Sequence, residues 1–445
     1  MELSSLVEIM KNSGIVGAGG AGFPSYAKLD KRADTIVLNC AECEPLFNLH
    51  RQLLANFAKE ILTALECVRG ALDAKQVVIA VKPEYKNAID AVEFYLPEFK
   101  NITISLLPEI YPAGDEIVTI YETTGRIVKP GNLPISEGVI VYNVETMLNT
   151  YFAIAEGSGV THKYIVVAGE VKKPVMVKAP LGMKYKDIVK LAGGETVKNY
   201  DYIGGGVMTG RLVSENDVVT KTSNAILVLP SDHPVVLKRK TKTRINIARA
   251  MSACCQCRSC TDLCSRNVLG YPIEPHKFMR AVSKGMDSDA KAVLNSAFCS
   301  QCGLCELYAC PQDLSPRTLI GVAKDELRKK GVRAEMPEFK GVSPDRDYKK
   351  VPMHRLVARL GLTKYNIGAA FIEDEILPGE VKIMLTQHIG PACTPVVKVK
   401  DTVAAGQLVA TPGEKLGAGI HSSIDGTVTS VTDTYIIVKK SGGKS

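Results

Sequence analysis

Two short runs of cysteines constrain this chain more than any other feature of its sequence. The first reads CCQCRSCTDLC and the second CSQCGLCELYACP; leaving Cys255 aside, they hold eight of the thirteen cysteines. Their spacings are C-x2-C-x2-C-x3-C and C-x2-C-x2-C-x4-C-P. The first spacing is that of bacterial ferredoxins, in which thiolates hold 4Fe-4S clusters. Grouped cysteines in a long globular chain indicate metal ligation rather than disulfides.

The ferredoxin pattern also predicts which cysteines act together. In two-cluster ferredoxins, the last cysteine of a run binds the cluster of the other run. We therefore predict one 4Fe-4S centre held by Cys254, Cys257, Cys260 and Cys310, and another held by Cys299, Cys302, Cys305 and Cys264. Structural zinc is the alternative, but zinc usually takes two C-x2-C pairs per ion, which triplets fit poorly. Ser265 replaces the usual proline after the first run, and Cys255 is an extra thiol without an assigned role.

A glycine-rich segment near the start, GAGGAGFPSYAKL from residue 17, fits the G-x-G-x-x-G pattern of dinucleotide-binding turns. That pattern requires a strand before it and a helix after it. The preceding segment, ELSSLVEIMKNSG, instead has apolar residues at helical spacing and ends in glycine, so it predicts a helix. The sequence thus argues against a Rossmann turn and for a glycine loop whose backbone amides can approach an anion.

Length and composition limit the class of protein. A chain of 445 residues predicts three or four domains, and 46% hydrophobic with 23% charged residues predicts globular domains. No apolar run approaches the ~18 residues of a membrane span, and the N-terminus lacks signal-peptide features, so we expect a soluble cytosolic protein. The net charge of +8 is mild. The basic stretch LKRKTKTR at 237–244 has no interleaved aromatic residues, which favours a solvated linker over a nucleic-acid site.

Sequence patterning divides the chain into five segments of a multidomain α/β protein. Strands alternate with helices in the first segment, with one long helix over about 48–70, and this alternation predicts a parallel three-layer sheet. The expected segments are an α/β domain (1–155), a β-grasp-like domain (160–232), a ferredoxin-like domain (245–335), a linker with a helix (336–378) and an all-β barrel-sandwich domain (379–441).

The last segment also resembles a biotinyl or lipoyl carrier domain. Lys415 stands ten residues before Asp425, near the place of a carrier lysine. The flanking residues, PGE and LGAG, differ from the tight hairpin that presents a modified lysine. We therefore expect an unmodified barrel and assign no role to Lys415.

Five features in fixed order carry a family resemblance over essentially the whole chain. The motifs GIVGAGGAGFPSYAKL, NCAECEP, YPAGDE and YNVET, followed by the cysteine runs, resemble the cobalamin reductases of propanediol-utilization microcompartments. More broadly, they are similar to the RnfC protein of the Rnf complex and to the flavin-binding subunit of respiratory complex I. The barrel-like domain comes first in RnfC, whereas here it is last, as in the cobalamin reductases.

The resemblance implies FMN and NADH in the first domain. Chemistry agrees with the residue types, since glycine amides and a lysine suit a phosphate and polar side chains suit a ribityl chain. The implied residues are Gly17, Gly19 and Gly20 against FMN, Lys28 near its phosphate, Asn39, Glu42 and Glu44 in N-x-x-E-x-E-P, Tyr111, Gly114, Asp115 and Glu116 in Y-x-x-G-E-E, and Asn143 and Thr146 in N-V-E-T. Within this set, Glu44 is associated with NADH. Asp115, Tyr142 and Ala41 depart from the family pattern.

The expected chemistry is electron transfer. NADH gives up two electrons together and each cluster accepts one, so a flavin between them can divide the pair. We expect an oxidoreductase that passes electrons from NADH through FMN and two 4Fe-4S clusters to cobalamin, without an acid or base side chain. One alternative is an NADH oxidoreductase of the RnfC type that delivers electrons to a ferredoxin or partner protein. Another is a non-catalytic electron-transfer adaptor.

The resemblance implies partners and a location as well. The partners are cobalamin or a cobalamin-handling enzyme, with a microcompartment shell protein or a ferredoxin-like protein as further candidates. The location is the cytoplasm, inside a bacterial microcompartment. No corrinoid-binding motif is visible, because the seven histidines are scattered.

Overall fold

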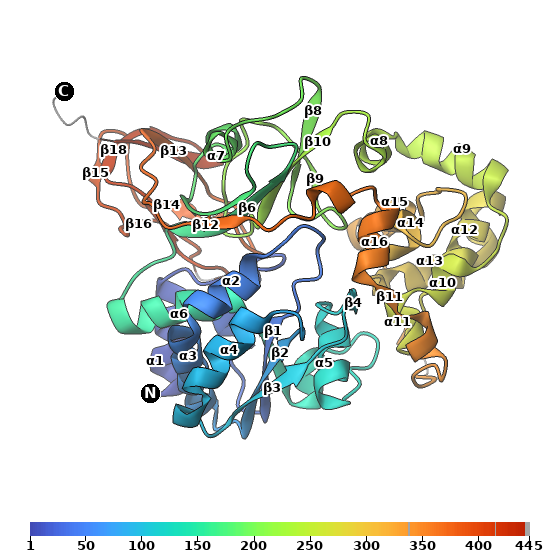
Figure 1. The fold of residues 1–445 in the computed structure, drawn as a ribbon, viewed down its shortest axis with the longest axis horizontal. Coiled ribbons are helices and arrows are strands. Elements are labelled where there is room, and N and C mark those ends of the chain that lie inside the picture. The colour runs from blue at the N-terminus through green and yellow to red at the C-terminus, as the bar shows by residue number, and fades with distance from the viewer. Residues whose placement is uncertain (337–338, 414, 441–445) are drawn as a thin grey trace.

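Four units of secondary structure follow one another in the computed structural model, which describes residues 1–336, 339–413 and 415–440 (Figure 1). They are an α/β unit, a β-grasp-like unit, a helical ferredoxin-like unit that contains both cysteine runs, and an all-β unit. The predicted fold class is therefore confirmed. Within the described residues, no helix has the length and apolar character needed to cross a membrane.

The α/β unit is built on a four-stranded parallel sheet in the order β3-β2-β1-β5. Successive residues of β1 face opposite sides, so that Ile36 and Leu38 pack with the helices of one layer and Val37 packs with α5 in the other. The elements are α1 (Leu3–Asn12), η1 (Ser25–Lys28), β1 (Thr35–Cys40), α2 (Leu49–Asn56), α3 (Ala58–Leu72), β2 (Gln76–Val81), α4 (Lys86–Tyr95), η2 (Leu96–Glu98), β3 (Ile102–Leu106), β4 (Ile110–Tyr111), α5 (Glu116–Thr124), η3 (Pro134–Glu137), β5 (Val139–Asn143) and α6 (Val144–Glu156).

This strand order creates a switch point. Strands β2 and β3 lie on one side of β1, and β5 lies on the other. In open parallel sheets, ligands bind in the crevice at the carboxyl ends of the strands where the order reverses. We therefore expect the crevice at the ends of β1 and β5, where Asn39 and Asn143 are register partners.

The single long helix expected over about 48–70 is wrong. The chain forms α2 and α3, separated at Phe57, whose φ of −128° and ψ of 35° are not helical. The Phe57 ring packs against the ring of Tyr164 in the next unit, with centroids 6.3 Å apart. Apolar residues keep their helical spacing across the break. The contact of Phe57 with Tyr164 lies at the place where the two helices separate.

The β-grasp-like unit has a six-stranded sheet in the order β12-β7-β6-β10-β8-β9. The hairpin of β6 and β7 is antiparallel, and β10 pairs with β6 in parallel. The short β12 comes from the segment expected to be a linker and adds an edge strand. The elements are β6 (His162–Gly169), β7 (Val175–Pro180), α7 (Tyr185–Leu191), β8 (Tyr200–Gly204), β9 (Arg211–Val213), β10 (Ala225–Pro230) and β12 (Ala370–Ile372).

The ferredoxin-like unit is made of short helices that pack against α5 of the α/β unit. Phe278 and Ile320 share one apolar cluster with Ile117 and Ile120 of α5. The basic stretch at 237–244, expected to be a linker, belongs to helices α8 and α9. The elements are α8 (Pro234–Lys240), α9 (Thr243–Ala253), α10 (Ser259–Asp262), α11 (Ser265–Val268), α12 (Pro275–Lys284), η4 (Met286–Asp289), α13 (Ala290–Asn295), η5 (Ser296–Phe298), α14 (Leu304–Leu307) and α15 (Pro316–Lys329).

The connecting segment and the all-β unit complete the chain. The connection contains η6 (Arg346–Lys349), β11 (Val351–Pro352), α16 (Met353–Arg359) and η7 (Thr363–Tyr365), and β11 pairs with β4. The all-β unit has two sheets, β13-β19-β18-β15 and β14-β16-β17, rather than one closed sheet. Its strands are β13 (Glu380–Met384), β14 (Thr394–Pro395), β15 (Thr402–Val403), β16 (Leu408–Thr411), β17 (Ile420–His421), β18 (Gly426–Val431) and β19 (Tyr435–Lys439). Lys415 is exposed between β16 and β17.

A buried lysine joins three of the four units. The Lys221 side chain is only 1% exposed, and its Nζ donates to the carbonyl oxygens of Gly14 and Gly419, both at 2.6 Å. Gly14 starts the glycine loop of the α/β unit, Lys221 belongs to the β-grasp-like unit, and Gly419 belongs to the all-β unit. This contact positions the base of the glycine loop.

Candidate functional site

The two cysteine runs adopt the same backbone shape. The residue before the second cysteine has a positive φ in both runs, 55° at Gln256 and 61° at Gln301. The residue after that cysteine also has a positive φ, 71° at Arg258 and 84° at Gly303. A short helix follows each, α10 and α14. The repeated spacing therefore produces the same local backbone fold in both runs.

The first group of thiols gathers around one hollow. Cys254, Cys257, Cys260 and Cys310 all line it. Burial, and then the neighbouring thiols of Cys310, Cys257 and Cys254, raise the pKa of Cys260 to about 12. The last cysteine of the second run thus lies with the first three of the first run. Cys257 and the additional Cys255 are exposed, so this hollow lies at the surface.

The second group of thiols lies deeper in the molecule. Burial, together with the thiols of Cys302 and Cys299, raises the pKa of Cys264 to about 12. Burial also raises the pKa of Cys305, helped by Cys299, Cys302 and Cys264. The Cys305 side chain is buried. The structure therefore brings the last cysteine of the first run to the first three of the second.

The surroundings of the thiols fit iron-sulfur clusters. The backbone N–H of Leu314 donates to Sγ of Cys310 at 3.3 Å, and the amide of Gln256 donates to Sγ of Cys254 at 3.1 Å. The buried hydroxyls of Ser265, Ser296 and Ser315, beside the two runs, have no partner among the residues that the structure describes. Such donors suit cluster sulfur atoms, whose potentials respond to hydrogen bonds.

A mononuclear metal fits less well. Across the described ranges, no set of three or more His, Cys, Asp or Glu side chains could hold a single ion. A tetrahedral zinc site needs four donors directed at one point.

The glycine loop lies against the start of α6, at the switch point of the sheet. The N–H of Ala18 donates to Oγ1 of Thr146 at 3.0 Å. A Cβ at Gly19 would overlap the side-chain amide of Asn143, whereas a Cβ at Gly20 would meet nothing within 4 Å. Gly19 and Gly20 are exposed. The loop therefore passes close to Asn143 and presents backbone to the crevice.

The neighbouring polar residues complete this crevice. Lys28 Nζ donates to the Val141 carbonyl at 2.9 Å and forms a 3.0 Å ion pair with Glu116. Asn39 donates to the carbonyl oxygen of Gly114 at 3.0 Å. The structure thus brings together Gly17, Gly19, Gly20, Lys28, Asn39, Gly114, Glu116, Asn143 and Thr146 around the ends of β1 and β5. A lysine, exposed glycine amides and side-chain amides fit a flavin that carries a phosphate.

Glu42 and Glu44 lie elsewhere. The Glu42 carboxylate accepts from the N–H of His50 at 2.8 Å and so occupies the first turn of α2. The Glu44 carboxylate accepts from the N–H groups of Met208 and Thr209 at 2.8 and 2.9 Å. Burial raises the pKa of both carboxyl groups. Glu44 therefore ties the α/β unit to a glycine-containing loop of the β-grasp-like unit.

Tyr111 and Asp115 reach the second cysteine group. The Tyr111 hydroxyl donates to the backbone carbonyl of Cys302. Asp115 accepts from the N–H groups of Ile117 and Val118 at the start of α5 and pairs with Arg266 at 2.9 Å. Arg266 lies two residues after Cys264. These contacts hold the second cysteine group against the α/β unit.

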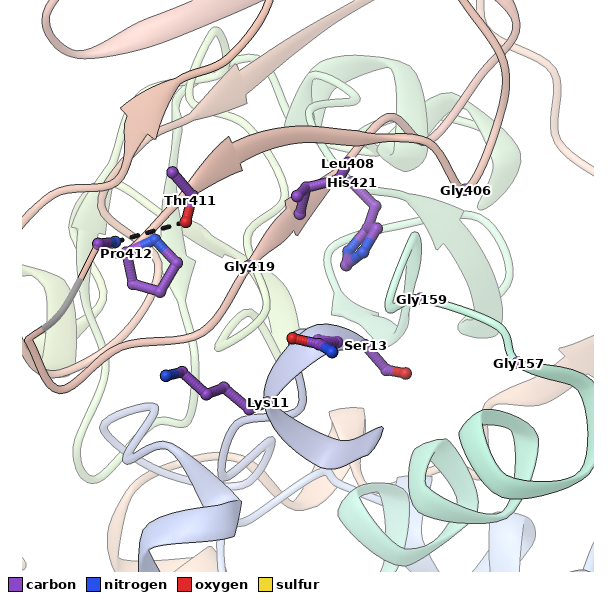
Figure 2. Close-up of a pocket in the computed structure, with 12 residues that line it drawn as sticks. Lys11, Ser13, Gly157, Gly159, Gly406, Leu408, Thr411, Pro412, Gly419 and His421 are labelled. Atoms are coloured by element: carbon purple, nitrogen blue, oxygen red, sulfur yellow. Dashed lines mark hydrogen bonds between the residues drawn. The ribbon is translucent and has the colours of Figure 1, made fainter. Parts of the chain in front are cut away.

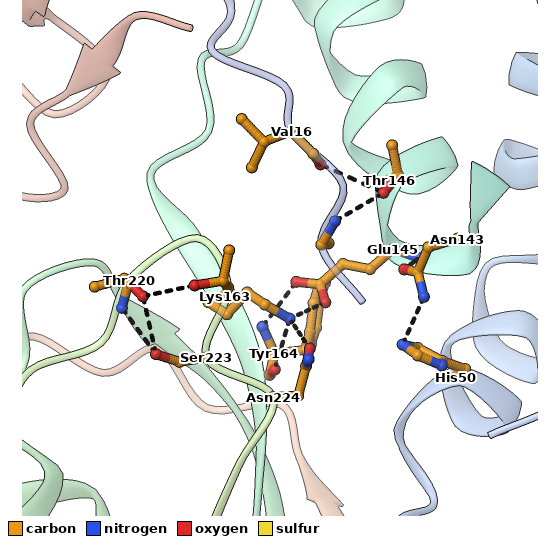
Figure 3. Close-up of polar contacts among 12 residues, drawn as sticks. Val16, His50, Asn143, Glu145, Thr146, Lys163, Tyr164, Thr220, Ser223 and Asn224 are labelled. Atoms are coloured by element: carbon orange, nitrogen blue, oxygen red, sulfur yellow. Dashed lines mark hydrogen bonds and ion pairs between the residues drawn. The ribbon is translucent and has the colours of Figure 1, made fainter. Parts of the chain in front are cut away.

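Sequence reasoning missed a polar network behind the crevice, shown in Figure 3. Asn143 contacts Nε2 of His50 at 3.0 Å, and burial lowers the pKa of His50 to about 3, so that the neutral ring accepts from the Asn143 amide. Glu145 pairs with buried Lys163 of β6, which also donates to Asn224 at 2.8 Å. A lysine inside the apolar strand HKYIVVAG was the available signal for this pair. His50 carries no such signal, because its partner is 93 positions away.

A separate hollow of about 480 Å³ lies between the end of α1 and the all-β unit (Figure 2). Lys11, Ser13, Gly159 and His421 are among its lining residues. In Figure 1 the elements around it, α1 and β16, lie on the opposite side of the molecule from the cysteine runs. It is therefore not part of the site built by the thiols and the glycine loop.

Comparison with protein families assigns a known domain to each unit. Residues 10–152 match the Nuo51 FMN-binding domain, and residues 164–212 match the SLBB domain. Residues 253–315 match the 4Fe-4S dicluster domain, and residues 362–443 match the RnfC Barrel sandwich hybrid domain. The crevice lies within the first match and both cysteine groups lie within the third.

Three characterised proteins show the extent of the similarity. Cobalamin reductase PduS of Salmonella typhimurium is 40% identical over 97% of this chain and 95% of its own length. Cobalamin reductase PduS of Citrobacter freundii is 38% identical over 98% and 97%. A subunit of the Na(+)-translocating ferredoxin:NAD(+) oxidoreductase complex of Acetobacterium woodii is 29% identical over 59% of this chain and 58% of its own.

Proposed function

The chain belongs to the cobalamin reductase PduS family of oxidoreductases, and from that premise we propose that it transfers electrons from NADH to cobalamin. The cofactors would be FMN, held in the crevice between β1 and β5, and two 4Fe-4S clusters, held by the two thiol groups. When bound, the flavin takes up a hydride and releases electrons singly, and the clusters carry single electrons.

One observation carries this proposal: Tyr111 and Asp115 of the α/β unit contact the second thiol group through Cys302 and Arg266. The first thiol group instead has an exposed neighbourhood, at Cys255 and Cys257. We infer that the site of Cys264, Cys299, Cys302 and Cys305 is the inner one. The site of Cys254, Cys257, Cys260 and Cys310 is the outer one, from which electrons leave.

The chain's own residues bind and position. Gly19, Gly20 and Lys28 would receive the flavin phosphate, with Asn143 and Thr146 beside the ribityl chain. His50 fixes the Asn143 amide: Asn143 Oδ1 accepts from the N–H of Glu145, so the amide NH2 faces Nε2 of His50 and donates to it in the tautomer protonated at Nδ1. Glu44 is the residue we assign to NADH, and its present partners Met208 and Thr209 favour a position for that nucleotide between the first two units. No side chain is assigned an acid or base role.

The assignment of cobalamin as the electron acceptor rests on the names of the relatives. Both PduS relatives are named as cobalamin reductases and match almost the full chain. The second candidate is delivery to a ferredoxin or other partner protein, supported by the ferredoxin:NAD(+) oxidoreductase relative over 59% of the chain. Within the same proposal we assign the protein to a bacterial microcompartment of the cytoplasm, with a cobalamin-handling enzyme or a shell protein as neighbours.

The test is an anaerobic titration of the reconstituted protein with NADH, followed by hydroxocobalamin without any protein partner. We expect bleaching of the flavin absorbance and stoichiometric reduction of the cobalamin. The variant Cys302→Ser should bleach but fail to reduce cobalamin, whereas the matched Cys255→Ser should behave as the parent protein. Absence of bleaching would support the adaptor. Bleaching with reduction of ferredoxin but not of cobalamin would support the RnfC type.

A further inference from the structure

We propose that the outward side of α9, beside the outer thiol group, is the docking surface for an acidic electron-carrier protein. This inference rests on the proposed direction of electron flow out of the molecule. A ferredoxin-like protein is already one of the partners that the family resemblance implies. The inference adds the charge of that partner and the surface that binds it.

Helix α9 exposes apolar residues where a surface helix normally exposes polar ones. Its inward side carries Asn246 and Ala250, which are buried. The outward stripe consists of Arg244, Ile247, Ala248 and Met251, at positions i, i+3, i+4 and i+7, which share one helix face. Ile247 is 38% exposed and Met251 is 59% exposed. An exposed apolar stripe with a basic residue at its end is typical of an interaction site.

The chain segment that carries this stripe has charged side chains of one sign. From His233 to Thr261 the chain contains seven lysines and arginines and no aspartate or glutamate. Several of these cations have partners from other elements: Lys238 and Arg249 face Asp313, Lys240 faces Asp201, and Arg258 faces Asp262. Among the described residues, Lys242 and Arg244 form no ion pair. These two cations, at the start of α9, are left to pair with a partner protein.

The stripe leads directly to the outer thiol group. Helix α9 ends at Ala253, and Cys254 follows it. Cys255 and Gln256, next along the chain, are exposed. Figure 1 shows α9 at the edge of the molecule farthest from the all-β unit, with none of the other described units drawn over it. A protein bound to the stripe would therefore sit beside the outer thiol group.

These features favour a protein over a small molecule. Charge complementarity steers an acidic partner, and an apolar centre supplies the desolvated contact of a protein interface. Weak, fast-exchanging redox complexes bury a small interface, for which one exposed helix face suffices.

The experiment measures binding directly, with an acidic two-cluster bacterial ferredoxin as the probe. Affinity for the immobilised holoprotein is determined by surface plasmon resonance at low and high NaCl. We expect salt to weaken binding, Lys242→Glu/Arg244→Glu to weaken it at least about tenfold, and Met251→Ser to weaken it several-fold. The matched control is Lys86→Glu/Lys100→Glu, two exposed lysines of the α/β unit, which should leave the affinity within about twofold.

Two results would overturn the proposal: no binding of the ferredoxin to the parent protein, or an affinity unchanged by the reversal at α9. A fall in hydroxocobalamin reduction by the same variants without any protein would assign the stripe to the corrinoid and also reject it. If charge reversal lowers the iron content, Lys242→Gln/Arg244→Gln is measured in its place. NADH-driven reduction of ferricyanide separates the docking hypothesis from the proposed function. If only the docking hypothesis fails, the protein still reduces ferricyanide. If the proposed function fails, ferricyanide reduction is abolished but ferredoxin binding can still be measured.

Discussion

The Tyr111 hydroxyl donates a hydrogen bond to the backbone carbonyl oxygen of Cys302, and so joins the flavin-binding unit to the inner thiol group. The phenol is almost fully buried, and burial raises its pKa well above the ordinary value, so it remains a donor at any physiological pH. The Arg266–Asp115 pair lies alongside. These contacts fix the cysteine runs against the α/β unit, as the proposed electron path requires.

Replacing Tyr111 by Phe removes this bond without removing the ring. We expect a loss of about 1 kcal/mol in the free energy of unfolding, because the Cys302 carbonyl loses a buried partner. The reduction potential of the inner centre should shift, since hydrogen bonding near cluster ligands tunes it. Redox titration followed by electron paramagnetic resonance measures the potential, and Tyr348→Phe, at a 92% exposed ring, is the control. Equal potentials in both variants would contradict the role of Tyr111.

Removal of single cysteines tests the crossed assignment of the thiols. Cys310→Ala should abolish the same centre as Cys257→Ala, although the two residues belong to different runs. Cys264→Ala should likewise match Cys302→Ala. Each variant should lose about half of its iron and sulfide, because each cluster is held by four thiolates. If Cys310→Ala instead has the same spectrum as Cys302→Ala, each run binds its own cluster.

The glycine loop offers a matched pair of substitutions. In Gly19→Ala the added methyl group overlaps the Asn143 amide, whereas in Gly20→Ala it meets open space. We expect Gly19→Ala to weaken FMN binding at least about tenfold, or ~1.4 kcal/mol, and Gly20→Ala to change it little. Titration of the apoprotein by quenching of FMN fluorescence measures both. The same loss in both variants would point to the phosphate contact and away from Asn143.

The buried pair of Lys163 and Glu145 should contribute to the fixed arrangement of the first two units. Lys163→Met leaves a buried carboxylate without its cation, which costs about 3–5 kcal/mol, and the additional change Glu145→Gln should recover part of that loss. Urea unfolding measures each free energy. Lys190→Met removes the exposed pair with Asp187 and should cost less than about 1 kcal/mol. A similar loss of unfolding free energy for Lys163→Met and Lys190→Met would contradict a larger contribution of the buried pair to stability.

His50 predicts a dependence of stability on acid. Burial lowers its pKa in the folded protein to about 3, below the ordinary 6.5. The contribution of neutral His50 to the free energy of unfolding is therefore present above pH 6.5 and is lost as the pH falls toward 3. The free energy of unfolding changes by at most about 1.4 kcal/mol per pH unit over this range. The variant His50→Gln keeps a polar partner for Asn143 but does not titrate, so its unfolding free energy should fall less steeply between about pH 6.5 and 4. Parallel curves for the two proteins would contradict this assignment.

Much of the secondary structure follows from local pattern. The alternation of TIVLN and QVVIAV with amphipathic segments predicts the parallel sheet, and the helix before the glycine loop excludes a Rossmann turn, as the structure shows. The break at Phe57 is not marked by the apolar spacing, which continues across it, and the Phe57 ring lies against Tyr164 of another unit. The basic stretch 237–244 reads as a linker because charge alone cannot reveal that its helix packs through Asn246 and Ala250.

The sequence by itself determined the chemistry of the donors. The C-x2-C-x2-C spacing predicts which thiols act together, and the glycines predict exposed backbone that suits an anion. Only the tertiary structure decided that Tyr111 lies on Cys302, that His50 holds Asn143, and that α9 turns an apolar stripe outward. Those two pairs are 191 and 93 positions apart along the chain. Contacts over such separations arise from the packing of whole units, and local residue preferences carry no record of them.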